Sequence, residues 1–189
     1  MAQPEAFEAC RPLLRAFEDL RIDYLVGGSL ASSFHGIPRS TQDVDVVADL
    51  KPVHGPLLVS RLQELYYIEL DRIQHAILSR SSFNVLYLRT MFKVDIFMLN
   101  DDPYSREEMR RRQRIEVEGE PLEIASAEDT VLQKIVWYRR GGEISDRQWL
   151  DIVGVMKVCR GKLDSEYLDR WASHLEITEL LARAHDDAG

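Results

Sequence analysis

LVGGSLASSFHGIPRSTQDVDVV, at residues 25–47, is the stretch that decides the fold of this chain. It begins as a short apolar strand, turns at Gly27-Gly28-Ser29, continues as a brief helix and enters a second strand. Glycines between a strand and a helix let the backbone approach a ligand closely, and the N–H groups of the new helix favour a phosphate. Ser29 is the expected N-cap of that helix. The stretch therefore predicts a phosphate-binding turn between two strands.

The second strand carries two acidic residues one position apart. Because side chains alternate between the faces of a strand, Val44 and Val46 can face a core while Asp43 and Asp45 project together from the other face. Their spacing along the strand is about 7 Å. Mg²⁺ is typically held by one or two carboxylates together with substrate phosphates. The hypothesis is a metal-holding strand beside the phosphate turn, and its alternative is a solvated strand face.

A third carboxylate, Asp95, lies in a later strand predicted over residues 93–99. It is flanked by apolar residues, where an ionised group is costly unless it is paired or binds a metal. Two interpretations remain open. Asp95 either completes a metal site with the first two acids or forms a structural salt bridge with Lys93 or Arg39.

Composition limits the classes of protein to consider. The 189 residues are 45% hydrophobic, enough for one compact core or for one domain with a helical annex. A net charge of -8 means that any nucleic-acid contact would have to be local. Cys10 and Cys159 lack metal-ligand spacing and are typical of thiols in a reducing compartment. No apolar run is long enough for a membrane span and no signal peptide is apparent, so we expect a cytoplasmic protein without a membrane partner.

In order and spacing, these motifs resemble the nucleotidyltransferase superfamily with the polymerase-beta-like fold. That family is marked by Gly-Gly/Ser, then Asp-x-Asp/Glu, then a third acid on a neighbouring strand. The resemblance covers about residues 20–155. Within the family, the chain is most similar to the bacterial branch that includes the AbiEii-type toxins of abortive-infection, or type IV toxin-antitoxin, systems. The residues that carry this likeness are Gly27-Gly28-Ser29-x-Ala31, His35-Gly36 and Pro38-Arg39-x-Thr41-x-Asp43-Val44-Asp45.

The resemblance implies an enzyme that moves a nucleoside monophosphate from an NTP to an acceptor and releases pyrophosphate. Mg²⁺, as two ions, would be held by Asp43, Asp45 and Asp95, and Asp95 would also help to remove the proton of the acceptor hydroxyl. The triphosphate would be held at Gly28 and Ser29. The full set of nucleotide-binding candidates is Gly27, Gly28, Ser29, Arg39, Thr41 and Lys134.

The implied fold class is α/β, in the α+β sense, with a mixed, mostly antiparallel sheet flanked by helices and followed by a C-terminal helical region. We expect a nucleotidyltransferase core domain at residues 1–110, and a hairpin and helical region at 111–189 that complete the cleft. Pro12 is a candidate break in the first helix, and the last five residues are expected to fray. Periodicity predicts helices over residues 5–20, 57–66 and 127–140 and beyond 145, strands over 83–88 and 93–99, and a hairpin over 115–124.

Several helical residues keep two interpretations. Lys134 either reaches the triphosphate or lies on a solvated flank of its helix. Trp137 and Tyr138 either stack on a base or belong to the core. Asp146 and Asp151 resemble a later acidic motif of the toxin-like branch, but Ser145-Asp146-Arg147 departs from the Arg-Asp order of that motif, and Asp146 equally fits a helix start.

The acceptor also stays open among RNA such as tRNA, a protein and a small molecule. An RNA could be steered by one local basic patch through salt-dependent phosphate contacts. The favoured alternative is a solvated helix balanced by nearby glutamates. A toxin would have an antitoxin protein as its partner, and a different class of function is a non-catalytic nucleotide- or partner-binding module with the same fold. The patch consists of Arg106, Arg110, Arg111, Arg112 and Arg114.

Overall fold

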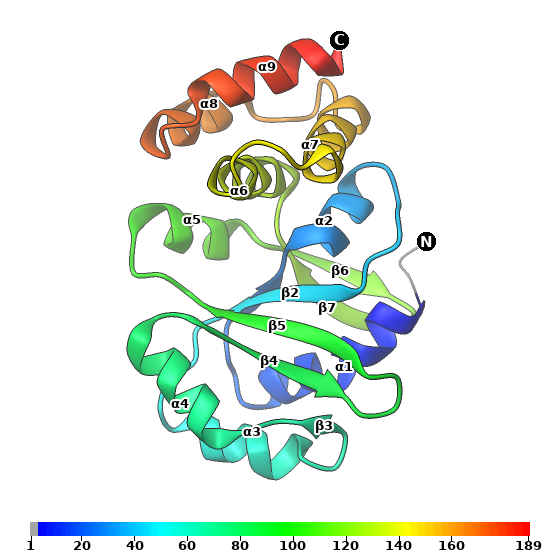
Figure 1. Cartoon of the computed structure of the whole chain (residues 1–189), viewed down its shortest axis with the longest axis vertical. Helices are drawn as coiled ribbons and strands as arrows, with labels where there is room; N and C mark the ends of the chain where they lie inside the picture. The colour runs from blue at the N-terminus through cyan, green and yellow to red at the C-terminus, as the bar shows by residue number, and fades with distance from the viewer. Residues whose placement is uncertain (1–3) are drawn as a thin grey trace.

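The computed structural model describes residues 4–189, and within them one seven-stranded sheet organises the chain (Figure 1). Its strands are β1 (Tyr24–Val26), β2 (Asp43–Ala48), β3 (Tyr66–Tyr67), β4 (Ser82–Tyr87), β5 (Phe92–Met98), β6 (Gln113–Val117) and β7 (Glu120–Ile124). They lie in the order β3-β4-β5-β2-β1-β7-β6. The β2–β5 and β1–β7 pairs are parallel, and the other four are antiparallel. The predicted α/β fold with a mixed, mostly antiparallel sheet is confirmed.

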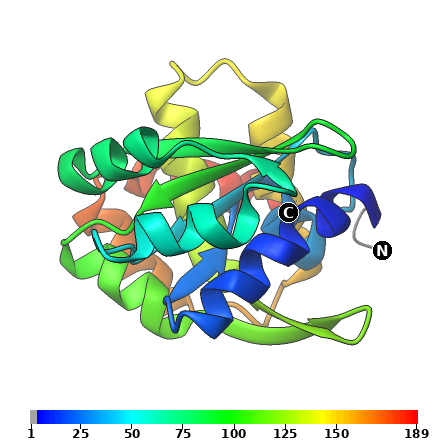
Figure 2. The ribbon, with the colours of Figure 1, turned by 90° about the horizontal axis from the view of Figure 1, so that it is seen from below.

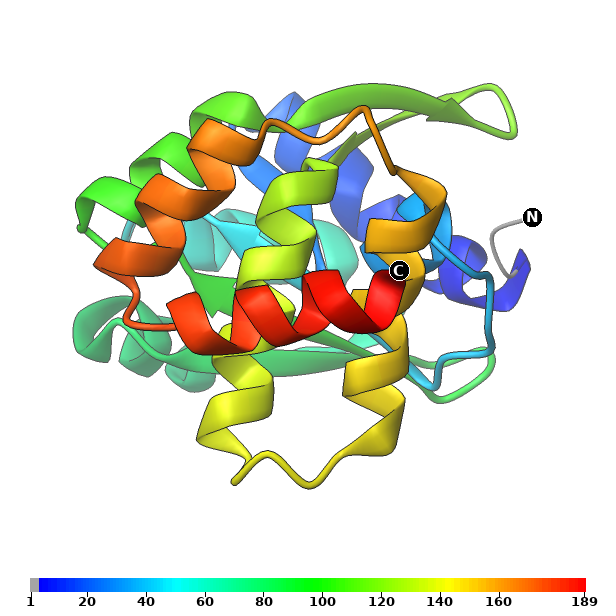
Figure 3. The ribbon, with the colours of Figure 1, turned by 90° about the horizontal axis from the view of Figure 1, so that it is seen from above.

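Helices cover both faces of the sheet. One face packs on α1 (Pro4–Asp19), α3 (His54–Leu62) and α4 (Leu70–Ser79), and Figure 2 shows α1 and α3 lying across it. On the other side lie α2 (Gly28–His35), α5 (Pro103–Arg111), α6 (Ala127–Arg140) and α7 (Asp146–Val158), with α8 (Ser165–His174) and α9 (Thr178–Ala188) outermost (Figure 3). Among residues 4–189, no helix is both long and apolar enough to cross a membrane.

The hairpin β6–β7 extends the same sheet as the strands before residue 110. Helices α6 to α9 share an apolar cluster with Tyr104 of α5, separate from the cluster beneath the sheet. The division into 1–110 and 111–189 stays a prediction, since both the sheet and this helical cluster include residues from each side of it.

The alternation predicted for the central strands is present. Val44 and Val46 of β2 are fully buried in the apolar cluster with α1, α3 and α4. Asp43, Asp45 and Val47, which alternate with the buried residues, are only partly buried and face the side of α2. In the parallel β2–β5 register, Asp45 lies beside Asp95. A shift of one residue would send these carboxylates into the core, so burial of the valines determines where the acids lie.

Pro12 does not divide α1, because the hydroxyl of Tyr66 hydrogen-bonds to backbone groups on both sides of the proline. Proline removes a helical hydrogen bond and crowds the preceding turn. Tyr66 of β3 is buried against α1, where its hydroxyl donates to the Ala9 carbonyl at 2.6 Å and accepts from the Leu13 N–H at 3.2 Å. The hydroxyl thus bridges two backbone groups that flank the proline, and the helix continues to Asp19.

Three local expectations were wrong. The helix predicted over residues 57–66 ends at Leu62, and its last predicted residue lies in β3. Helix α4 was not predicted, although Ile73, Ala76 and Ile77 recur at helical spacing and pack on the core. The last residues do not fray: α9 reaches Ala188, which packs into the cluster of the C-terminal helices.

Glu108 of α5 is buried, with 3% of its surface exposed, and accepts a hydrogen bond from the Gln133 side chain at 3.0 Å. Burial, and then the charge of Asp129, raise the pKa of Glu108 to about 8. A carboxyl whose pKa is higher in the folded than in the unfolded protein costs no stability below its ordinary pKa. The cost grows as the pH rises towards the folded value, because the unfolded chain loses the proton first.

Glu108→Gln should therefore stabilise the protein at pH 8, by about 4 kcal/mol if each pKa unit is worth 1.36 kcal/mol. At pH 4 the two proteins should be equally stable. Urea denaturation at both pH values measures the difference. Glu107→Gln is the control: the ion pair with Arg110 lowers the pKa of Glu107, so this change should not stabilise. An equal effect of Glu108→Gln at both pH values would contradict the prediction.

Candidate active site

The turn after β1 is tied to the acidic strand. The N–H of Gly27 donates to the Asp45 carbonyl at 2.9 Å, and helix α2 begins at Gly28. Gly28 has a φ of +54°, and a Cβ placed on it would lie 1.8 Å from Oδ2 of Asp45. The position therefore requires glycine for two reasons, its backbone conformation and its contact with a carboxylate.

Ser29 is not the N-cap that the sequence predicts. The N-cap is Gly27, and no side chain caps this helix end. Ser29 lies in the first turn of α2, where its hydroxyl accepts a hydrogen bond from Nη2 of Arg39 at 2.6 Å. The N–H groups of the first turn are therefore not used by a capping side chain, as a phosphate-binding helix start requires.

Gly28→Ala should reduce both stability and any activity that depends on Asp45. The positive φ alone costs on the order of 1–3 kcal/mol. The methyl group would in addition displace the Asp45 carboxylate. Gly119→Ala is a matched control, because Gly119 has a φ of +81° but nothing within 4 Å of its Cβ position. Thermal unfolding of the two variants separates the cost of the positive φ from the cost of displacing Asp45. Equal losses of stability in both variants would show that the Asp45 contact does not matter.

Three predicted acids lie together on one face of two neighbouring strands. Asp43 and Asp45 are on β2 and Asp95 is on β5, and all three are partly buried on the side away from the main core. Burial, then the charges of Asp43 and Asp95, raise the pKa of Asp45 to about 6. The hydroxyl of Thr41 donates to Oδ1 of Asp43 at 3.1 Å and orients it. We call Asp43, Asp45 and Asp95 the carboxylate face.

Lys93 joins the carboxylate face. Its Nζ lies 2.7 Å from Oδ2 of Asp95 and 3.8 Å from Oδ2 of Asp43. The salt bridge considered from the sequence for Asp95 is thus formed with Lys93, while Asp95 still lies beside Asp45. Among residues 4–189, no three acidic, histidine or cysteine side chains stand close enough together to hold a metal ion as they are. The oxygen donors nevertheless fit a hard divalent cation in type, number and charge.

A second cluster forms around Asp151 of α7, whose side chain is 5% exposed. Both of its oxygens accept from Arg39, with Nε to Oδ1 and Nη2 to Oδ2 at 2.7 Å each. Nζ of Lys134 on α6 also lies 2.7 Å from Oδ2. Burial acts to raise the pKa of Asp151, but hydrogen bonds and charge from Arg39 and Lys134 lower it. We call Arg39, Lys134 and Asp151 the basic cluster, since it carries two positive charges for one negative.

Lys134 is therefore not on a solvated flank, because it is buried and paired within the basic cluster. Asp151 was not among the site residues predicted from the sequence, yet it pairs with two of them, Arg39 and Lys134. Its signal was an aspartate inside the apolar run at residues 150–156, on a helix face that also buries Ile152 and Val155. Asp146, the other aspartate of that motif, begins α7 as the helix-start interpretation expects.

The carboxylate face and the basic cluster adjoin each other. Besides its hydrogen bond with Asp151, which raises the pKa of Arg39, the guanidinium is influenced by the charge of Asp43. Lys134 acts on Asp45 in the same way and opposes the rise of the Asp45 pKa. Helices α2, α6 and α7 pack on one another and bring the two groups together. The chain thus places cations suited to phosphate beside oxygens suited to a divalent ion.

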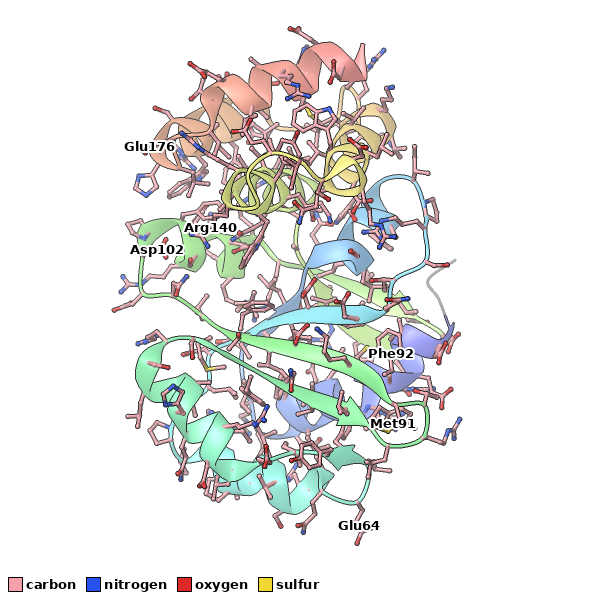
Figure 4. The ribbon with its side chains drawn as sticks, viewed as in Figure 1. Glu64, Met91, Phe92, Asp102, Arg140 and Glu176 are labelled. Atoms are coloured by element: carbon pink, nitrogen blue, oxygen red, sulfur yellow. The ribbon has the colours of Figure 1, made fainter. Side chains whose placement is uncertain are left out.

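An aromatic pair borders this region. Phe97, two residues after Asp95 on the same strand face, lies with its ring centroid 6.0 Å from that of Trp137 on α6. Trp137 is 46% exposed, and the Arg140 guanidinium lies 5.3 Å from its ring centroid. Figure 4 shows Arg140 between α6 and the sheet. Of the two aromatics flagged in the sequence, Trp137 is available to a ligand, whereas Tyr138 is buried in the helical core.

The predicted basic patch at residues 106–114 is balanced by acids, which fits the solvated-helix alternative. Every arginine of the patch forms an ion pair, and Arg112 and Arg114 share Glu123. Local positive charge available to an RNA is correspondingly small. The pairs are Arg106–Asp101, Arg110–Glu107, Arg111–Glu128, Arg112–Asp23 and Arg114–Glu123.

Comparison with known proteins supports the fold. No family model matched the chain, and no curated protein matched its sequence. The lincosamide antibiotic adenylyltransferase LnuA, bound to lincomycin, matches 80% of this chain and 96% of its own with a TM-score of 0.54 and 14% identity.

Two further solved structures match at 14% identity. An antigenic nucleotidyltransferase-like protein from Paracoccidioides brasiliensis covers 97% of this chain and 94% of its own, with a TM-score of 0.58. ANT(2")-Ia in complex with adenylyl-2"-tobramycin covers 88% and 94%, with a TM-score of 0.56. The chain therefore has the fold of these nucleotidyltransferases.

Proposed function

We propose that this protein is a Mg²⁺-dependent nucleotidyltransferase that moves a nucleoside monophosphate from an NTP to a hydroxyl group. The observation that carries the proposal is that both groups meet at the Gly28 turn: Arg39 of the basic cluster donates to Ser29, and Asp45 of the carboxylate face lies against Gly28. A triphosphate with a divalent ion has both the negative and the positive charge that these two groups complement. The nucleotidyltransferase fold supports the same reading.

The residues take distinct parts in this proposal. The N–H groups at the start of α2, Ser29, Arg39 and Lys134 bind the β- and γ-phosphates, and Asp151 positions the two cations. Asp43, Asp45 and Asp95 would hold Mg²⁺, which when bound supplies charge stabilisation to the transferred phosphoryl group and the leaving pyrophosphate.

Asp95 accepts the proton of the attacking hydroxyl as that oxygen bonds to the α-phosphorus. The bond from the α-phosphorus to the bridging oxygen breaks, and pyrophosphate leaves with the electron pair. Thr41 holds Asp43 in place through its hydroxyl. The protein thereby contributes position and charge rather than a covalent intermediate.

For the acceptor, we favour a small hydroxyl-bearing molecule over RNA. The arginines at residues 106–114 are paired with acids, which lowers the local positive charge that favoured an RNA. Two proteins of the same fold are described with an antibiotic or its adenylylated product, lincomycin and adenylyl-2"-tobramycin. A toxin with a cognate antitoxin, as the AbiEii-like motifs suggest, is the second candidate and would show RNA or protein as the acceptor.

The decisive test is incubation of the purified protein with Mg²⁺ and each α-labelled NTP, against total RNA, protein extract and a panel of small hydroxyl compounds. We expect label in the small-molecule fraction, and none after EDTA or with the Asp43→Ala, Asp45→Ala double variant. Label on RNA or protein would favour the toxin reading. Nucleotide binding by calorimetry with no labelled product in any fraction would instead show a non-catalytic module.

Trp137 is expected to stack on the nucleotide base, because it lies one helical turn from Lys134 and is exposed beside the carboxylate face. Trp137→Ala should raise the KM for NTP about tenfold, as stacking is worth roughly 1–3 kcal/mol per base. Trp137→Phe should restore most of the affinity. Inorganic tripolyphosphate, which has no base, should inhibit all three proteins equally. A change in acceptor KM alone would assign Trp137 to the acceptor instead.

A further inference from the structure

Lys93 holds a particular place among the acids of the carboxylate face. In the parallel β2–β5 register it lies directly beside Asp43, and Asp95 follows two residues later on the same face. Its ammonium contacts Asp95 at 2.7 Å and lies 3.8 Å from Asp43. The side chain is nevertheless 40% exposed. Lys93 therefore pairs with oxygens of the carboxylate face while its side chain keeps access to solvent.

This position sets up a competition. Carboxylates that face one another repel unless a cation lies near them, and the Lys93 ammonium supplies such a charge. A divalent ion would need the oxygens of Asp43 and Asp95 that Lys93 contacts. The ion and the Lys93 ammonium would then lie close together, and two positive charges at short distance repel. The ion can bind fully only if the ammonium moves away from the Asp95 oxygen.

We infer that Lys93 is a resident competitor of the divalent cation, which keeps the affinity for the ion low until a nucleotide binds. This inference rests on the proposed function of the same site. An incoming triphosphate offers Lys93 a new anionic partner, and the long, partly exposed side chain allows the ammonium to reach it. The ion and the nucleotide then favour each other's binding, and by linkage the coupling is the same in both directions.

The test is the affinity for Mn²⁺ alone, measured by calorimetry without nucleotide on the full chain. Lys93→Met should bind Mn²⁺ about tenfold more tightly than the wild type, within the usual range of coupling between sites. In the wild type, a non-hydrolysable NTP analogue should tighten Mn²⁺ binding. In Lys93→Met the analogue should have an effect smaller by the same factor.

Three further variants make the result specific. Lys93→Arg keeps the positive charge and should behave like the wild type, and Lys93→Gln should repeat the effect of methionine with a polar side chain. Lys51→Met removes a lysine that pairs with Asp49 at 3.7 Å and should leave Mn²⁺ affinity unchanged. Thermal unfolding confirms that each variant is folded before its affinity is compared.

The outcomes separate this inference from the proposed function. Unchanged Mn²⁺ affinity in folded Lys93→Met and Lys93→Gln overturns the inference, even if the wild type transfers nucleotides. Equal tightening in Lys51→Met also overturns it, because the effect would then reflect net charge alone. Failure of the wild type to transfer any NMP counts against the proposed function, whereas the Mn²⁺ comparison still decides the role of Lys93.

Discussion

Asp45→Asn is expected to abolish nucleotidyl transfer and, at the same time, to stabilise the protein at neutral pH. Asp45 lies in the centre of the carboxylate face, beside Asp95 and in contact with the Gly28 turn. An amide is nearly isosteric but cannot supply the charge that a divalent ion requires. Loss of metal-ion catalysis is worth several kcal/mol, so we expect a fall in rate of at least ~10³-fold.

The stabilising effect follows from the same charges. Burial and two neighbouring carboxylates raise the pKa of Asp45 to about 6, so ionised Asp45 disfavours the folded state. This cost is absent below the ordinary pKa of an aspartate and complete above pH 6. At 1.36 kcal/mol per unit, and with partial solvent screening, Asp45→Asn should add about 2 kcal/mol at pH 8 and almost nothing near pH 3.5.

Urea denaturation without metal at the two pH values tests the stability effect, and labelled-NTP transfer tests the rate. Asp49→Asn is the control, since Asp49 lies just beyond β2 and pairs with Lys51 outside the site. It should change neither quantity appreciably. An Asp45→Asn protein that transfers NMP at the wild-type rate would remove the carboxylate face from the proposed mechanism. The expected result, a variant that is more stable but less active, is typical of substitutions at functional sites.

Asp151→Ala should be the most destabilising single change in the site. Asp151 accepts hydrogen bonds from both Arg39 and Lys134, and its removal leaves two cations without their shared partner in a largely buried place. Breaking a buried ion pair by removing one partner costs about 3–5 kcal/mol. Misplacement of the two cations should also lower kcat.

An anion should compensate for part of this loss. Inorganic pyrophosphate can occupy the unpaired cations, so it should raise the melting temperature of Asp151→Ala more than that of the wild type. Asp146→Ala, on the same helix but at its exposed first turn, should lose at most about 0.5 kcal/mol, as a surface substitution does. A similar loss in both variants, or no response of Asp151→Ala to pyrophosphate, would contradict the role given to the basic cluster.

Local patterns predicted the parts of the site that lie on single elements. The Gly27-Gly28 turn and the alternation of Asp43 and Asp45 with buried valines were both expected, because strand geometry alone separates the two faces. The assignment of Ser29 as a helix cap was wrong, since its hydroxyl instead accepts from Arg39. Capping preference reports local tendencies and carries no information about a partner ten residues away.

The sequence by itself determined the order of the motifs and the candidate residues for phosphate and metal, because these depend on short-range periodicity and on chemical type, and the type of sheet followed from the family resemblance of those motifs. Only the tertiary structure decided that Asp151 joins Arg39, 112 residues earlier, and that Lys93 occupies oxygens that a metal would use. It also decided that α1 continues beyond Pro12, because the Tyr66 hydroxyl hydrogen-bonds to the backbone on both sides of the proline. Such contacts arise from the packing of separate elements, and side chains far apart in the chain acquire their partners only when the sheet and helices assemble.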